Sequence, residues 1–194
     1  MKRSITSLLL SLVLITSSSI TLSGCTTSNF QTAQNVYTVA NIALNLAQGE
    51  LPLLVSVGAI SQADETALSN FVGLAITFNG NYESCINNAQ NTMLTTSSKF
   101  VDCLGVFATS LSSPQTLALL HVVSAKGQSK AQAYVAAIVA AVNIGLAAFK
   151  AGQVAVPTVA PVTADIQVDI NQFQAKVIDN LPVNLRHIAV ANGY

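Results

Sequence analysis

The chain is poor in charge, histidine and tryptophan. Only 8% of its 194 residues are charged, two are histidine and none is tryptophan. The sequence also lacks the spacing patterns of serine hydrolases (GxSxG, SxxK), zinc proteases (HExxH), phosphate loops and dinucleotide sites (GxGxxG). Without a basic cluster to meet phosphates, nucleic-acid binding is disfavoured. We therefore expect no catalytic residue, cofactor site or metal site, and a protein that is not an enzyme.

A signal-peptide pattern opens the chain. Lys2 and Arg3 form a short cationic region, and the apolar stretch over residues 5–20 is softened by serine and threonine. This stretch is too short and too interrupted to span a bilayer comfortably, and small residues follow it instead of a charged flank. We expect residues 1–24 to be removed.

The tetrapeptide Leu22-Ser23-Gly24-Cys25 resembles the lipobox of bacterial lipoproteins. The resemblance covers residues 1–25 and implies that Cys25 becomes the first residue of the mature protein, carrying a diacylglyceryl group and usually a third, amide-linked chain such as palmitate. Stable anchoring takes two or more chains, because each buried methylene contributes only about 0.8 kcal/mol. The alternative is a secreted protein in which Cys25 pairs with another cysteine.

The resemblance also implies a place in the cell. An aspartate directly after the lipidated cysteine commonly retains such proteins at the inner membrane, and here that position is Thr26. We therefore expect a protein of the bacterial cell envelope, anchored by lipid to the outer membrane and facing the periplasm.

The mature chain is long enough to bury a core as one domain. Beyond residue 24 it carries six basic and eight acidic side chains, a net charge of about −2. We expect four segments: a short lipid tether (25–30), a helical bundle (31–152), a Pro/Val connector (153–163), and a C-terminal amphipathic helix and tail packed on the same domain (164–194).

Apolar residues recur at helical spacing along most of the mature chain, which predicts an all-α fold, a single bundle of about five to seven helices. Helix-start signals are expected at Ser61, Ser113 and Thr163. In the first half we expect a helix over 31–48 ended by Gly49, a short helix from Pro52 to Ile60, and a helix from Ser61 to Phe78 ended by an Asn79-Gly80 turn. A pair of helices is expected within 82–110. In the second half we expect a helix from Ser113 closed by Gly127, a helix over 129–151, a helix from Thr163, and one short turn in the tail from Leu181.

Two cysteines remain after lipidation, Cys85 and Cys103, in an oxidising compartment. If residues 82–110 formed one unbroken helix, these cysteines would lie about 27 Å apart, beyond the reach of a disulfide. The polar run over residues 95–98 supplies a break, so we expect two antiparallel helices joined by a disulfide. Free buried thiols and a metal pair are the alternatives, and the CxxC spacing typical of a metal site is absent.

The segment Ala131 to Phe149 contains 19 residues without a charge, between Lys130 and Lys150. That length could nearly span a hydrocarbon core. Eight alanines and polar residues dilute its hydrophobicity, so that insertion would be marginal. A buried core helix is the favoured interpretation, and a membrane-inserting helix is the alternative.

Few side chains suggest chemistry. His121 lies on an apolar helix face and His187 near the C-terminus, where a core or surface role is favoured over catalysis. Asp64 sits in the first turn of its predicted helix, which its negative charge stabilises. Asp165 and Asp169 lie four residues apart on one helix face, where a solvated face is favoured over a metal site.

Three functions fit the sequence. The first is a lipid-anchored, non-catalytic envelope protein that acts by contact with another envelope protein, with the cell wall or with itself. The second is a membrane-active lipoprotein that inserts the helix 131–149. The third is a small-ligand-binding or hydrolytic envelope protein, with a site assembled from His121, His187 and scattered carboxylates.

Overall fold

The computed structural model describes residues 29–120, 124–159 and 161–191 and confirms the all-α fold. Within these residues the secondary structure is helical and contains no strand. The helices in chain order are α1 (Asn29–Ser56), α2 (Gln62–Asn91), α3 (Ser97–Leu111), α4 (Pro114–Ala118), α5 (Ala125–Ala148), α6 (Ala164–Asn180) and α7 (Val183–Ala191).

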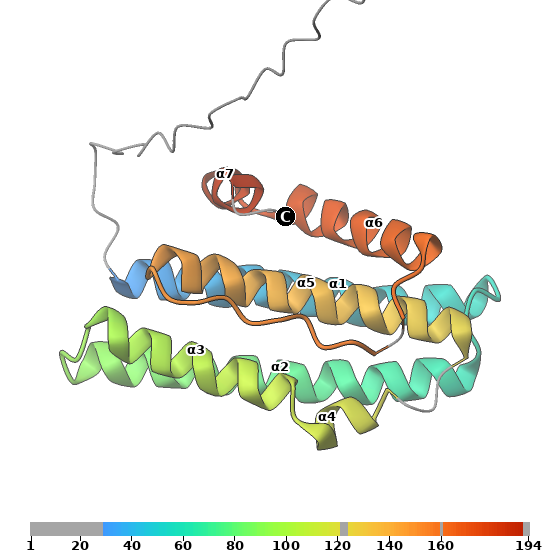
Figure 1. Ribbon diagram of the computed structural model, residues 1–194, viewed down its shortest axis with the longest axis horizontal. Coiled ribbons are helices and arrows are strands. Elements are labelled where there is room, and N and C mark those ends of the chain that lie inside the picture. The colour runs from blue at the N-terminus through green and yellow to red at the C-terminus, as the bar shows by residue number, and fades with distance from the viewer. Residues whose placement is uncertain (1–28, 121–123, 160, 192–194) are drawn as a thin grey trace, which may run out of the picture.

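The long helices run alongside one another in layers (Figure 1). α1 and α5 form the middle layer, α2 and α3 cover one side of it, and α6 and α7 cover the other. α5 is surrounded: from Ala131 to Val139 every residue is buried. It is also the one helix of the described chain long and apolar enough to cross a membrane, and 78% of its most apolar window is buried inside the bundle.

The expected break between Gly49 and Pro52 is wrong, because α1 continues to Ser56. Gly49 and Pro52 both face solvent. The buried stripe of the helix continues past them, with Ala47 at 1% and Leu51 at 0% exposure. Packing of that stripe therefore outweighs the local preference of glycine and proline for a helix end.

The expected turn at Asn79-Gly80 is also wrong, since α2 runs unbroken from Gln62 to Asn91. Asn79 is 1% exposed and faces α1, where its side-chain nitrogen lies 3.5 Å from the carbonyl oxygen of Tyr37. Three residues later, the hydroxyl of Tyr82 donates a 2.9 Å hydrogen bond to the carbonyl of Ala33. Contacts with α1 thus keep α2 helical at Asn79-Gly80, although this dipeptide is typical of turns.

The predicted disulfide is confirmed. Cys85 of α2 and Cys103 of α3 are bonded, with their Cα atoms 5.9 Å apart. The break between the two helices lies at residues 92–96, slightly earlier than the polar run suggested, and Thr96 caps α3 through a hydrogen bond from the Lys99 backbone.

The predicted caps Ser61, Ser113 and Thr163 each accept a backbone hydrogen bond from the third helical residue. The expected stop at Gly127 is wrong: Ser124 caps α5, and Gly127 lies inside its first turn. The expected single turn in the tail is a nine-residue helix, α7, with Leu185 and Ala189 buried.

The connector before α6 runs back along α5 (Figure 1), and its described residues form neither helix nor strand. Two amide side chains of α5 bind its backbone. Asn143 donates to the carbonyl of Val154 at 3.0 Å and accepts from its nitrogen at 2.8 Å. Gln132 donates to the carbonyl of Pro157 at 3.2 Å and accepts from the nitrogen of Val159 at 2.7 Å.

Candidate functional site

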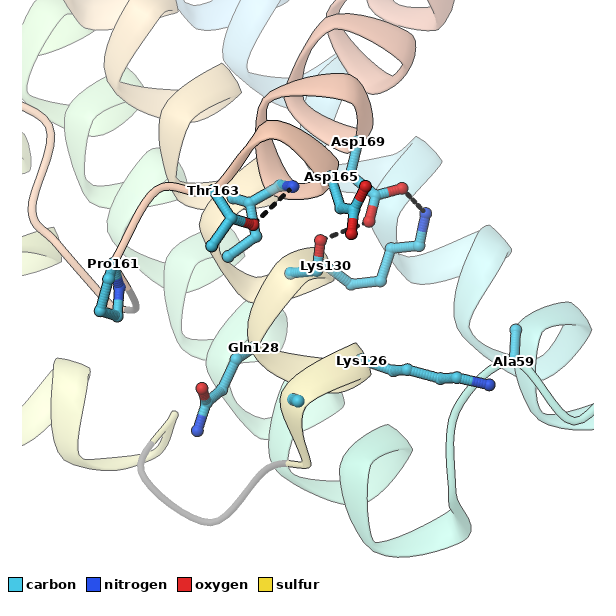
Figure 2. A pocket seen from close by; sticks show the side chains of 11 residues that line it. Ala59, Lys126, Gln128, Lys130, Pro161, Thr163, Asp165 and Asp169 are labelled. Carbon is cyan, nitrogen blue, oxygen red and sulfur yellow. Dashed lines mark hydrogen bonds and ion pairs between the residues drawn. The ribbon is translucent and has the colours of Figure 1, made fainter.

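A cleft of about 570 Å³ opens where α5 and α6 begin and where the chain passes from α1 to α2 (Figure 2). Ala59 of the α1–α2 connection forms part of its wall. The caps Ser124 and Thr163 fix the first turns of α5 and α6 at this end of the bundle. The first two turns of these helices present most of the polar side chains that line the cleft, namely Lys126, Gln128, Ser129, Lys130, Asp165 and Asp169.

Asp169 is held by two neighbours on α5. Lys130 Nζ donates to its Oδ1 at 2.7 Å, and the hydroxyl of Ser129 donates a short hydrogen bond to its Oδ2. Burial alone would raise the pKa of Asp169, but the hydrogen bonds from Lys130 and Ser129 and the lysine charge outweigh it and lower the pKa. Asp169 is therefore an ionised carboxylate that joins α6 to α5.

Lys126 and Asp165 are the exposed charges of the cleft. Lys126, in the first turn of α5, extends toward Ala59, whereas Asp165, in the first turn of α6, lies near the Lys130–Asp169 ion pair (Figure 2). The negative charge of Asp165 stabilises the N-terminus of its helix. One exposed cation and one exposed anion give the cleft no strong net preference for ligand charge.

A second carboxylate, fully buried, lies beside this end. Asp64 of α2 is 1% exposed and accepts hydrogen bonds from both Ser61 and Ser124, the caps of α2 and α5. Burial alone would raise the pKa of Asp64, but these hydrogen bonds outweigh it and lower the pKa. Like Asp169, Asp64 serves to fasten helices.

The described lining of the cleft is rich in charged, amide and hydroxyl side chains. Neither histidine nor cysteine is among the described residues that line the cleft. The Ser129 hydroxyl donates to Asp169, and the lowered pKa of this carboxylate makes it a weak base. Across the described ranges, no group of three or more His, Cys, Asp or Glu side chains is placed to hold a metal ion.

The residues singled out from sequence fall in different places. Cys25, Thr26 and His121 lie outside the described residues. His187 is exposed on α7 and does not line the cleft, while Asp165 and Asp169 both do.

Sequence reasoning missed the role of Lys130, which it treated only as the flank of an apolar helix. No local signal pairs Lys130 with Asp169, because 39 residues separate them.

Comparison with known proteins adds no assignment: no protein-family model matches the chain, and no curated protein or solved structure matches it.

Proposed function

We propose that the chain is a lipid-anchored, non-catalytic protein of the bacterial cell envelope that acts by contact with a partner, a second copy of itself included. The observation that carries the proposal is the short spacing between anchor and fold. α1 begins at Asn29, four residues after Cys25. Four residues extend at most about 14 Å, so an acylated Cys25 keeps this end of the bundle beside the membrane.

The polar cleft lies at the opposite end of the bundle. α1 has 28 residues, and at 1.5 Å per residue it spans about 40 Å. Ala59, just beyond the far end of α1, forms part of the cleft wall. An upright bundle therefore presents Lys126 and Asp165 away from the membrane, where a soluble partner or the cell wall can reach them.

Burial of α5 supports contact over membrane insertion. Gln132 and Asn143 of this helix are engaged with the connector backbone. Transfer of α5 into lipid would break these hydrogen bonds and expose polar groups to hydrocarbon, which costs several kcal/mol.

Acylation and membrane attachment test the anchor. In cells fed an alkyne-tagged fatty acid, the wild-type protein should be labelled and Cys25→Ala should not. Carbonate extraction should release Cys25→Ala and leave the wild type in the membrane. The paired change Cys85→Ala/Cys103→Ala, which leaves Cys25 in place, is the control and should keep the label. Retention of Cys25→Ala after carbonate would favour the membrane-inserting alternative.

Site-specific photocrosslinking tests the contact. A photoreactive amino acid at Lys126 should yield a discrete adduct in intact envelopes, with a partner or with a second copy. The same probe at Asp102, exposed on α3 away from the cleft, is the control. Adducts of equal yield at both positions, or none at Lys126, would contradict contact through the cleft.

A further inference from the structure

The connection between α2 and α3 forms an exposed tip without charge. From Asn91 to Ser98 every residue is exposed and none is charged. Two large apolar side chains lie at its centre: Met93 keeps 87% of its surface exposed and Leu94 keeps 55%. Adjacent exposed apolar side chains on an uncharged, hydroxyl-rich surface are typical of a site that binds a partner or a membrane.

Methionine is an unusual residue at position 93, because the backbone there is left-handed. Met93 has a φ of 58° and closes α2 by donating its N–H to the carbonyl of Gln90, while Leu94 donates to the carbonyl of Ala89. This is the Schellman arrangement, in which glycine is the favoured residue at the left-handed position. A methionine there adds strain and gains no packing, so its exposed side chain is not explained by the local fold.

The tip lies beside the start of α1. Asn29 donates a 3.0 Å hydrogen bond to the carbonyl of Thr95, and the hydroxyl of Ser97 lies 3.4 Å from the Asn29 side-chain oxygen. Cys25 precedes Asn29 by four residues. An acylated Cys25 is therefore confined within about 14 Å of the residue to which the tip is bonded.

Two lysines flank the tip at the same end of the bundle. Lys99 lies in the first turn of α3, and Lys150 follows the end of α5. The rings of Phe30, Phe100 and Phe149 pack in sequence at this end, with centroids 6.4 and 6.0 Å apart. These ring contacts bring the starts of α1 and α3 and the end of α5 together. Lys99 and Lys150 therefore lie at the same end of the bundle as the apolar tip.

We propose that Met93 and Leu94 insert into the headgroup region of the membrane to which Cys25 is anchored, with Lys99 and Lys150 beside anionic headgroups. This inference rests on the proposed lipid anchor and adds an orientation to it. Apolar side chains enter the boundary between headgroups and acyl chains, and cations beside them are attracted to anionic lipid. Lipid chains alone leave the bundle free to tilt, whereas a second contact beside them holds it upright.

The absence of tryptophan makes the proposal directly measurable. Met93→Trp in the full-length, acylated protein provides a single indole at the tip. The matched control is Val57→Trp, since Val57 is 75% exposed in the connection at the opposite end of the bundle. Both proteins are reconstituted into phosphatidylethanolamine/phosphatidylglycerol vesicles, with and without bromine on the acyl chains.

The indole of Met93→Trp should emit at shorter wavelength on reconstitution and should be quenched by the brominated chains, while that of Val57→Trp should show neither change. Adding Lys99→Gln/Lys150→Gln to Met93→Trp should weaken the quenching in vesicles rich in phosphatidylglycerol.

Flotation of the vesicles separates the two possible failures. If the proteins float but both indoles are quenched equally, or Met93→Trp is not quenched, the tip does not contact the membrane and the inference is overturned while the anchor stands. If the full-length proteins fail to float, the proposed lipid anchor is wrong and the inference falls with it.

Discussion

Asp64 and Ser124 join the first turns of two helices that are sixty residues apart in the chain. The backbone nitrogen of Ser124 lies 2.6 Å from Oδ1 of Asp64, and the Ser124 hydroxyl lies 2.7 Å from Oδ2. Oδ2 also accepts from the backbone nitrogen of Ser61 at 3.0 Å. A single buried carboxylate thus completes the cap of α2 and positions the cap of α5.

Asp64 should make the free energy of unfolding depend on pH. Its pKa is lowered in the folded protein, so its contribution is fully present above the unfolded pKa of about 3.9 and is lost as pH falls through the folded value. Asp64→Asn should reduce the free energy of unfolding by about 1–3 kcal/mol near neutral pH and flatten its decline in acid. Urea unfolding at a series of pH values measures this. Asp102→Asn, on the exposed face of α3, is the matched control, and an acid decline as steep in Asp64→Asn as in the wild type would contradict the prediction.

Gly145 lies where α5 packs tightly against α1 and α3. A Cβ added there would lie 2.5 Å from Cγ2 of Val36 and 3.0 Å from Cδ1 of Leu104. Val36 is buried and branched at Cβ, so it has little rotamer freedom to move away. Gly145→Ala should lower the free energy of unfolding by about 1–3 kcal/mol. Gly73→Ala, in an exposed part of α2 with open space around it, should raise it by about 0.5–1 kcal/mol; the same sign in both variants would refute the packing argument.

The disulfide between Cys85 and Cys103 should contribute about 3 kcal/mol to stability, because it closes a loop of 18 residues in the unfolded chain. Cys85→Ala/Cys103→Ala should therefore unfold at lower urea concentration than the oxidised wild type. Reduced wild type provides the control and should behave like the double variant. Equal midpoints for oxidised and reduced wild type would show that the bond adds no stability.

Asn143 should stabilise the protein through the connector. Asn143→Ala removes two hydrogen bonds to Val154 and should cost about 1–3 kcal/mol of unfolding free energy. Asn45→Ala is the matched control on an exposed face of α1, since it makes the same change in helix propensity. Urea unfolding of the two variants should differ by that amount. If Asn45→Ala were equally destabilising, the connector contacts would have no measurable effect.

Much of the helical pattern was predictable because local chemistry and burial agree. Ser61, Ser113 and Thr163 mark helix starts that the structure contains, and the disulfide followed from the need to bend the chain between its cysteines. The errors arose where tertiary packing opposes local preference. Pro52 looks like a helix start and Asn79 like a turn, yet each lies within a helix whose buried face continues through it.

The polar contacts of the fold were not predictable in the same way. In the sequence, Gln132 and Asn143 are among the polar residues that dilute the hydrophobicity of the segment 131–149, whereas in the structure each binds a backbone segment that comes later in the chain. Likewise, Asp169 has the sequence pattern of a solvated face but faces Lys130. Such partners depend on how helices are rotated against one another, and a single sequence does not record that rotation.

The two amides of α5 also determine how long the connector must be. Gln132 and Asn143 are eleven residues apart, which on a helix is a rise of about 16.5 Å and a return to nearly the same face. Their partners Val154 and Val159 are five residues apart, and five extended residues also span about 16.5 Å. The spacing of the two amides along α5 therefore equals the spacing of their partners along the extended connector. Inserting or deleting one connector residue would shift the register by about 3.3 Å and leave one amide without its partner.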